Sequence, residues 1–322
     1  MAGQDQVHAV LPEIQPMLAT AAALPGEGYD LDWGFEVNWD GARTVAYCAG
    51  DRTVRLVSGE GEDVTRTYPE LAGLGEQHGQ RQAVLDGEIV VLDDRGRPDL
   101  ELLRRRMGVV NPRKVARLTM DAPVHLMLFD VMYLDGRSLL PTPYRERRML
   151  LESLDLAGPR WSTPEWSEGD VQHAWATSLH HGYEGIVGKR LASDYQPGRR
   201  SPDWIKAKHI ETHDVVIGGW VEGRGDLRGL PGSLLVGVDA PDGLRFVGTV
   251  EDGLTAAERG ELGEYLGALT RADSPFAGFA DIPGAQWVEP RLVAEVTVSG
   301  WTTGGRLRHP TWQRLRPDLT RR

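Results

Sequence analysis

The chain of 322 residues has very few cysteines and lysines. Its one cysteine, Cys48, excludes an internal disulfide and a four-cysteine zinc site, and it fits a reducing cytoplasm. We expect this cysteine to be a small buried apolar residue. The basic residues are 32 Arg and only 4 Lys, namely Lys114, Lys189, Lys206 and Lys208. Because an ammonium group can lose its proton and a guanidinium group cannot, we expect lysine mainly where that difference matters.

Long apolar runs and a net positive charge are also missing. No apolar stretch approaches the roughly 20 residues that a membrane span needs. Residues 1–30 have neither a basic start nor a sustained apolar run, so we expect a cytoplasmic protein with no signal peptide and no membrane partner. The formal charge of −11 argues against a partner made of phosphates, because DNA affinity comes largely from Lys and Arg.

That charge is unevenly distributed along the chain. Residues 186–209 contain six basic and two acidic residues, and residues 304–322 contain six basic residues and one acid. These segments carry +4 and +5, which leaves −20 for the remainder. A nucleic-acid partner is therefore compatible with the acidic total, and its binding would be weak, salt-sensitive and concentrated at one face.

Hydrophobic patterns in the first two-thirds predict alternating strands and helices. Residues 84–92 and 124–134 have the apolar composition of buried strands and end in turn-like sequences. Residues 170–181 have the spacing of an amphipathic helix, with Leu179 among the residues on its inward face. Residues 145–156 predict a second helix, with Met149, Leu150 and Leu154 on its buried side.

The pattern changes after Lys208 to a series of short strands. They are expected at residues 215–220, 233–238, 244–250 and 294–298. One helix interrupts them, with a capping box at Thr255 and Glu258 and an apolar stripe formed by Leu262, Tyr265, Leu266 and Leu269. Several short strands with one helix suggest a small barrel. We therefore predict two domains, residues 1–210 and 211–322, with the boundary near 209–213.

Five short motifs follow one another in the first domain. They are Glu36-Val-Asn-Trp-Asp-Gly-Ala-Arg43, Asp86-Gly-Glu88, Phe129-Asp-Val131, Glu184-Gly-Ile-Val-Gly-Lys-Arg190 and Trp204-Ile-Lys-Ala-Lys208. Taken singly, each has an ordinary structural explanation: a hairpin turn, a solvated carboxylate, a core phenylalanine, or lysines on the solvated face of a strand. Their order and spacing, ahead of a strand-rich domain, make a shared functional site the better interpretation.

This series resembles the motifs of ATP-dependent DNA ligases, which belong to the lysine nucleotidyltransferases together with RNA ligases and mRNA capping enzymes. The resemblance is strongest to the ligase module of bacterial end-joining ligases and their stand-alone relatives. It extends from Pro16-Met-Leu-Ala19 through residues 193–204 to Arg306-Leu-Arg-His-Pro-Thr-Trp312 and Arg316. It implies an α+β fold, in which a nucleotidyltransferase (adenylation) domain is followed by a C-terminal OB-fold β-barrel.

In that family, a lysine amine attacks the α-phosphate of ATP, AMP passes to a DNA 5′-phosphate, and a 3′-hydroxyl displaces it. The resemblance implies ATP and Mg²⁺ (or Mn²⁺) as cofactors, and nicked or broken double-stranded DNA as the partner of a monomer that works with end-joining or repair proteins. Its implied roles cover the base, the ribose, the metal and the phosphates. Glu36 would meet the adenine edge, Phe129 would stack on the ring, Arg43 and Glu88 would hold the ribose, Glu184 and Glu88 would hold the metal, Lys206 and Lys208 would neutralise the α-phosphate, and Arg308 and Arg316 would orient pyrophosphate.

Asn38 stands at the position of the family's nucleophilic lysine. The lone pair of an amide nitrogen is delocalised into the carbonyl, so we predict that Asn38 forms no adenylate. An engineered substitution and a naturally degenerate relative both explain it. Gly59, Leu100 and Leu319 also depart from family patterns, which favours the natural origin.

Three functional hypotheses follow from this substitution. The first is a ligase impaired in its first step that still seals a pre-adenylated nick. The second is a non-catalytic protein that holds DNA or ATP for a partner in repair. The third is an RNA ligase or capping enzyme, which the end-joining-like second domain disfavours.

Overall fold

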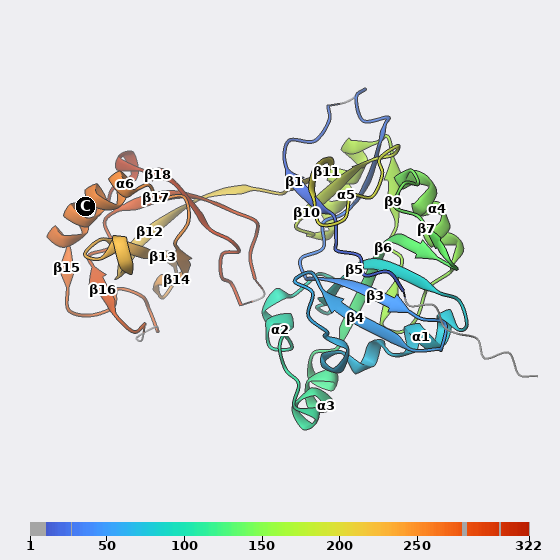
Figure 1. Ribbon diagram of the computed structural model, residues 1–322. Helices are drawn as coiled ribbons and strands as arrows, with labels where there is room; N and C mark the ends of the chain where they lie inside the picture. Colours follow the sequence, from blue (N-terminus) through green and yellow to red (C-terminus); the bar gives the residue numbers. More distant parts are fainter. Residues whose placement is uncertain (1–10, 27, 279–281, 303, 322) are drawn as a thin grey trace, which may run out of the picture. The chain divides into compact units, whose positions relative to one another are not determined.

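The computed structural model describes residues 11–26, 28–278, 282–302 and 304–321. It divides into two compact units, Met1–Lys208 and His209–Arg322. Figure 1 shows a unit with two sheets and several helices, and a second unit that is mostly strands. Each unit has its own hydrophobic core.

The first unit contains two sheets. The five strands of the first sheet, in spatial order, are β1 (Leu18–Ala21), β11 (Arg200–Lys208), β10 (Gly185–Arg190), β2 (Trp33–Val37) and β9 (Trp166–Glu168). The six strands of the second are β4 (Val54–Ser58), β3 (Ala42–Cys48), β5 (Ala83–Val91), β6 (Val124–Leu134) and β7 (Arg137–Ser138), with β8 (Trp161–Ser162) paired to β6. A core cluster that includes Val45 of β3, Met132 of β6 and Trp204 of β11 packs residues of both sheets together.

Helices and short turns complete the first unit. They are 3₁₀ turns η1 (Thr65–Thr67) and η2 (Pro69–Leu71), and helices α1 (Gly73–His78), α2 (Leu100–Arg104), α3 (Pro112–Asp121), α4 (Tyr144–Ser153) and α5 (Val171–His181). The side chain of Asp170 caps α5 by accepting a hydrogen bond from the His173 amide. Burial raises the pKa of Cys48 to about 12, so its thiol is an inert core group, as expected from the sequence.

The second unit is built around one long strand, β12 (Glu211–Glu222). The strands of its sheet, in order, are β14 (Gly243–Val250), β13 (Pro231–Ala240), β12, β16 (Ala285–Val288) and β15 (Thr270–Arg271), while β17 (Val293–Val298) pairs with both β12 and β18 (Thr311–Leu315). Helix α6 (Ala256–Ala268) begins with the predicted capping box between Thr255 and Glu258. The turns η3 (Gly225–Leu227) and η4 (Pro317–Leu319) complete this unit.

Three predictions about buried helix faces were wrong. Met149 is 58% exposed, Leu179 is 53% exposed and Tyr265 is 58% exposed. In α4, the buried positions are instead occupied partly by Arg147 and Arg148, which are 0% and 1% exposed. Apolar periodicity misplaced this face because ion-paired arginines, rather than Met149, point into the protein.

Candidate functional site

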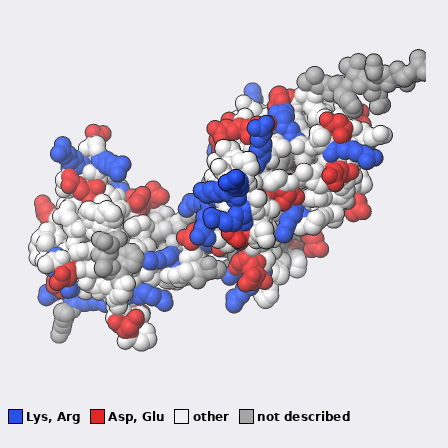
Figure 2. Space-filling model, turned by 90° about the horizontal axis from the view of Figure 1, so that it is seen from below, with Lys and Arg blue, Asp and Glu red and all other residues white. Residues whose placement is uncertain are grey.

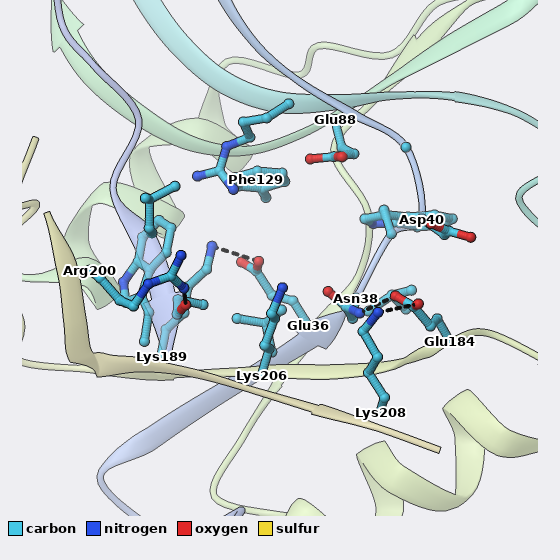
Figure 3. A pocket seen from close by; sticks show the side chains of 18 residues that line it. Glu36, Asn38, Asp40, Glu88, Phe129, Glu184, Lys189, Arg200, Lys206 and Lys208 are labelled. Carbon is cyan, nitrogen blue, oxygen red and sulfur yellow. Dashed lines mark hydrogen bonds and ion pairs between the residues drawn. The ribbon is translucent and has the colours of Figure 1, made fainter. Parts of the chain in front are cut away.

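A pocket of about 280 Å³ lies between the two sheets of the first unit. Strands β2, β10 and β11 line it from the first sheet, and β3, β5 and β6 line it from the second. Figure 3 shows the charged side chains that point into it. All eight predicted site residues of the first domain line this pocket: Glu36, Asn38, Arg43, Glu88, Phe129, Glu184, Lys206 and Lys208.

The turn after β2 is fixed by close packing of its glycine. A Cβ added to Gly41 would lie 2.3 Å from the carbonyl oxygen of Ile89 in β5. Only glycine allows this approach between the turn and the neighbouring strand. The Asp-Gly sequence predicted a turn, and the structure shows that this turn holds Asn38 and Asp40 at the pocket wall.

Asn38 shares the carboxylate of Glu184 with a lysine. Its Nδ2 donates a hydrogen bond of 2.6 Å to Oε2 of Glu184. The Nζ of Lys208 lies 2.5 Å from Oε1 of the same carboxylate, and Lys208 is the more exposed partner. Figure 3 shows these three side chains together on one side of the pocket. The asparagine therefore acts as a hydrogen-bond donor where the resemblance places a nucleophile.

Glu36 lies within a group of buried donors. The Nζ of Lys189 is 2.6 Å from Oε2 of Glu36, and Nε of Arg148 is 3.7 Å from Oε1. The hydroxyl of Tyr144 also donates to Oε1. Because Glu36 is only 7% exposed, these partners offset the cost of burying its charge. Sequence analysis assigned no role to Lys189, Tyr144 or Arg148, and the only available signal was that Lys189 lies within a motif.

Lys189 is enclosed by aromatic rings. Its Nζ lies 4.5 Å, 4.8 Å and 4.3 Å from the ring centroids of Phe129, Tyr144 and Trp204. Burial lowers the pKa of Lys189, while the carboxylate of Glu36 acts in the opposite direction. This lysine links the predicted base-stacking residue, Phe129, to the predicted base-edge residue, Glu36.

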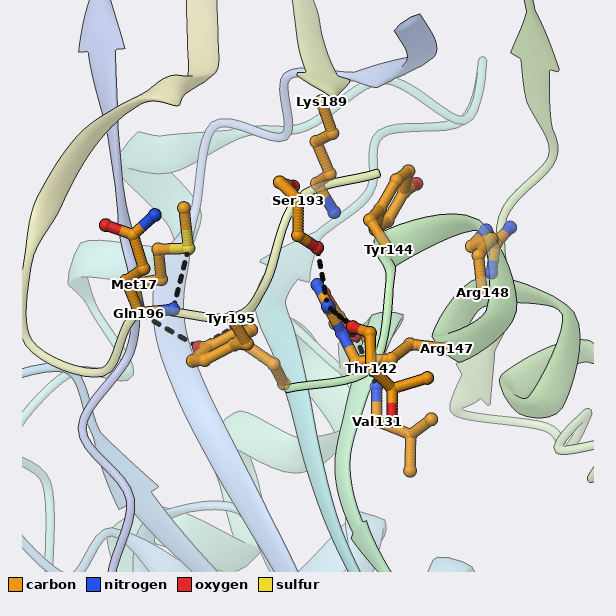
Figure 4. A network of polar contacts seen from close by, with 12 residues as sticks. Met17, Val131, Thr142, Tyr144, Arg147, Arg148, Lys189, Ser193, Tyr195 and Gln196 are labelled. Atoms are coloured by element: carbon orange, nitrogen blue, oxygen red, sulfur yellow. Dashed lines mark hydrogen bonds and ion pairs between the residues drawn. The ribbon is translucent and has the colours of Figure 1, made fainter. Parts of the chain in front are cut away.

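A second buried ion pair, between Arg147 and Asp130, lies near Lys189 and outside the pocket lining. Nε and Nη2 of Arg147 donate to the two carboxylate oxygens of Asp130 at 2.8 Å and 2.9 Å, and both side chains are 0% exposed. Nη1 of Arg147 also donates to the carbonyl oxygens of Thr142 and Ser193. Figure 4 shows how this network connects α4 with the segment after β10. Because that segment follows Lys189 directly, the network helps to fix the lysine's position.

Arg43 is held by Asp86. The guanidinium donates to both Asp86 oxygens at 2.7 Å and lies 4.6 Å from the Phe129 ring centroid. Burial acts to lower the pKa of Arg43, but the Asp86 carboxylate outweighs it and raises the pKa. Tyr195 also donates to Asp86, at 2.6 Å. Arg43 is therefore a fixed cation beside the aromatic ring.

Glu88 has a different environment from the other pocket carboxylates. It is half-buried, and no hydrogen bond or ion pair to its side chain occurs among the described residues. Loss of hydration raises the pKa of Glu88 to about 8, although Arg43 and Lys206 act to lower it. A carboxylate without a partner in a pocket fits a hydroxyl group or a hard cation such as Mg²⁺. Glu184, the other predicted metal ligand, lines the same pocket.

The two predicted residues of the second domain lie outside this pocket's lining. Arg316 forms ion pairs with Asp214 at 2.9 Å, Glu295 at 3.3 Å and Asp318 at 2.8 Å. These carboxylates raise the pKa of Arg316, with the Asp318 hydrogen bond contributing most. Arg308 is half-buried beside β17, where its carbonyl oxygen accepts a hydrogen bond from the Ser299 amide. Their predicted role toward pyrophosphate remains a prediction.

The described residues contain neither a cluster suited to a metal ion nor a helix that could span a membrane. No cluster of three or more His, Cys, Asp or Glu side chains suited to a metal ion occurs in residues 11–26, 28–278, 282–302 and 304–321. Within the same part of the chain, no helix combines the length and the apolar character needed to cross a membrane.

Comparison with known families places both units. Residues 16–208 match the family described as ATP dependent DNA ligase domain, and residues 227–319 match ATP dependent DNA ligase C terminal region. The multifunctional non-homologous end joining DNA repair protein LigD of Mycobacterium tuberculosis is 43% identical over 318 residues, which cover 98% of this chain and 40% of that protein. A DNA ligase of Natronomonas pharaonis is 35% identical over 98% of this chain and 58% of its own length. The chain thus spans about 40 to 58% of these curated relatives.

A solved structure gives the same result for the fold. Mycobacterial DNA ligase D, complexed with ATP and MES, is 43% identical and has a TM-score of 0.56, covering 95% of this chain and 96% of that one. These matches confirm the predicted fold, an adenylation domain followed by an OB-fold domain. The chain belongs to the ATP-dependent DNA ligase family.

Proposed function

We propose that this protein binds ATP in the pocket between the two sheets and acts on nicked or broken DNA without forming a lysyl-AMP intermediate. One observation carries the proposal. Asn38 lies in the pocket with the seven other predicted residues of the first domain, and its amide nitrogen donates to Glu184. The proposed nucleotide pocket would therefore hold, at residue 38, an amide group that cannot attack phosphorus.

The remaining side chains suit the later chemistry of ligation. In that chemistry, the 3′-hydroxyl of a nick attacks an adenylated 5′-phosphate, and AMP leaves. Lys206 and Lys208 would stabilise the negative charge that develops on the phosphate. Phe129 and Glu36 would hold the adenine of the AMP group, and Arg43 would lie beside its ribose. We therefore propose that the protein seals pre-adenylated nicks.

A divalent cation would be held by Glu184 and Glu88. When bound, Mg²⁺ would neutralise phosphate charge and orient phosphate oxygens. Glu184 must then exchange its contacts with Lys208 and Asn38 for the metal, which would leave the Lys208 ammonium available to a phosphate. Glu88 must be ionised to take part, so cation binding would release a proton near neutral pH.

The non-catalytic alternative uses the same pocket. In that case the protein holds DNA or ATP for a partner in end joining or repair. The ion pairs of Lys208 with Glu184 and of Lys189 with Glu36 favour it, because these carboxylates would compete with a phosphate for the two lysines.

Three assays separate these functions. Incubation with α-labelled ATP and Mg²⁺ should leave the protein unlabelled, whereas Asn38→Lys should become labelled. A nick carrying a 5′-adenylate should be sealed by the protein, and Lys206→Ala should lose this activity while Arg137→Ala, an exposed site outside the pocket, should retain it. Binding of the adenylated nick without sealing would favour the non-catalytic alternative. A label mapped by peptide mass spectrometry to Lys189, Lys206 or Lys208 would contradict the absence of an adenylate.

A further inference from the structure

A basic surface lies outside the nucleotide pocket, on the α2–α3 segment. We define the basic arm as residues 100–121, which comprise α2, the turn after it and α3. The arm contains six basic residues and two acids, Glu101 and Asp121, for a local charge of +4. The remainder of the chain carries −15, so the arm is a positively charged segment of a protein that is negatively charged overall. Lys114, which has no place in the pocket, belongs to this arm.

One buried arginine attaches the arm to the body of the first unit. Arg106 is 1% exposed and pairs with Glu70, with Nη1 and Oε1 2.7 Å apart. The same Nη1 donates to the carbonyl oxygen of Ala122, directly after α3, at 2.7 Å, and Nη2 donates to that of Thr67. Because these contacts fix the end of α2 to the end of α3, the arm presents its outer side chains from a defined position.

Four of the outer cations have no carboxylate partner. Arg104, Arg105, Arg113 and Lys114 are exposed, and no ion pair to them occurs in the part of the chain that the structure describes. Of the exposed cations on the arm, Arg117 has an ion pair, with Asp121 at 3.9 Å. Figure 2 shows basic side chains gathered on the face where α2 and α3 lie.

Helix stability does not explain the positions of two of these cations, Arg113 and Lys114. Arg113 and Lys114 occupy the first turn of α3, which contains no acidic residue. The first turn of a helix favours negative charge, and a cation there is disfavoured by about 0.3–1 kcal/mol. Binding of an anionic partner by these cations would offset this unfavourable interaction with the helix dipole.

Residues 186–209 and 304–322, the other two basic segments, differ from the arm because many of their cations pair with carboxylates. In residues 186–209, Lys189 and Lys208 pair with Glu36 and Glu184. In residues 304–322, charge is neutralised by contacts with acids at other positions, which pair Arg314 with Glu295, Arg316 with Asp214 and Glu295, and Arg321 with Asp239. The arm therefore keeps charge that those segments largely lose on folding.

We propose that the basic arm binds the phosphate backbone of double-stranded DNA, away from the nucleotide pocket and independently of the nucleotide. The inference rests on the proposed function in taking DNA as the partner. Unpaired Arg and Lys side chains bind phosphates by charge and release condensed counterions, which gives affinity without reading sequence. The arm gives an acidic protein one face on which a polyanion is attracted.

The test measures binding to an intact, labelled duplex without ATP or Mg²⁺. The arm variant is Arg104→Gln, Arg105→Gln and Arg113→Gln. The control variant is Arg52→Gln, Arg66→Gln and Arg137→Gln, which removes equal charge from exposed arginines of the same unit. A second arm variant, Arg113→Gln with Lys114→Gln, keeps the end of α2 unchanged. Thermal unfolding midpoints of all variants check that each one folds.

The expected result is a change in salt dependence that only the arm variants show. Losing three phosphate contacts lowers the slope of log affinity against log salt by about 2.7, so the affinity lost between about 50 and 200 mM salt is about 40-fold smaller. Equal slopes and affinities for the arm and control variants would overturn the proposal. The proposal would also be overturned if an arm variant kept its affinity for DNA but lost affinity for an acidic protein or an anionic vesicle. Because the duplex has no nick, failed sealing of adenylated nicks would count against the proposed function and not against the arm.

Discussion

Replacing Glu88 by glutamine tests the electrostatics of the pocket directly. Burial raises the pKa of Glu88 from an ordinary value of 4.5 to about 8. The folded protein therefore holds this proton more tightly than the unfolded chain does. Below about pH 4.5 the carboxyl is protonated in both states, and above about pH 8 the folded state must hold an unfavourable buried charge. The stability of the natural protein should fall as the pH rises through this window.

The size of the effect follows from the pKa. One pKa unit corresponds to about 1.4 kcal/mol, so the change from 4.5 to about 8 sets an upper limit of about 5 kcal/mol. Glu88 is half-buried rather than fully enclosed, and screening by solvent reduces this to about 2 kcal/mol. Glu88→Gln stays neutral, so it should match the natural protein near pH 4.5 and exceed its unfolding free energy by about 2 kcal/mol near pH 9.

Denaturant unfolding at several pH values, followed by tryptophan fluorescence, measures this difference. The matched control is Glu62→Gln, an exposed carboxylate in the loop after β4, which should show no such pH dependence. A stability difference for Glu88→Gln that stays constant across the pH range would refute the electrostatic explanation. A variant less stable than the natural protein above pH 8 would show that the ionised carboxylate is stabilised by partners such as Arg43.

Three further substitutions test the packing around the site and the second unit. Lys189→Met should lower the free energy of unfolding by about 3–5 kcal/mol, because it leaves Glu36 as a buried carboxylate without its closest cation; denaturant unfolding measures this. Gly185→Ala should prevent normal pairing of β10, because the new Cβ would lie 2.0 Å from the carbonyl oxygen of Ala207; loss of soluble folded protein, or of ATP binding, is the readout. Gly260→Ala in α6 adds a Cβ with nothing within 4 Å and should raise stability by about 1 kcal/mol, measured as a higher unfolding midpoint.

The sequence predicted the members of the pocket because their motifs lie on strands. Side chains two positions apart on a strand share a face, so Lys206 and Lys208 of β11 were expected to point the same way. Both line the pocket, and Glu88 and Phe129 reach it from β5 and β6. The strand at residues 124–134 was predicted with its observed bounds, because its long apolar run ends in a clear turn.

The charged interior could not be predicted in the same way. Arg147 and Asp130 are 17 positions apart, and Tyr144 and Glu36 are 108 positions apart. No local pattern identifies such partners, since a buried arginine looks like a solvated one in sequence. The error at Met149 has the same cause. Counting charges along residues 304–322 overestimated the positive charge of that segment for a related reason. The count does not include Asp214 and Glu295, which lie elsewhere in the sequence and pair with Arg316.

The environment of Asn38 bears on whether a lysine at this position could form an adenylate. Glu184 is already shared between Asn38 and the ammonium of Lys208. Asn38→Lys would bring a second ammonium to the same carboxylate, and two like charges there repel each other. A lysine at position 38 that is neutral avoids this repulsion and has a lone pair for attack on phosphorus. We therefore expect the Asn38→Lys protein to be labelled by ATP, and labelling of this variant but not of the parent protein would support the proposal that residue 38 alone prevents adenylation.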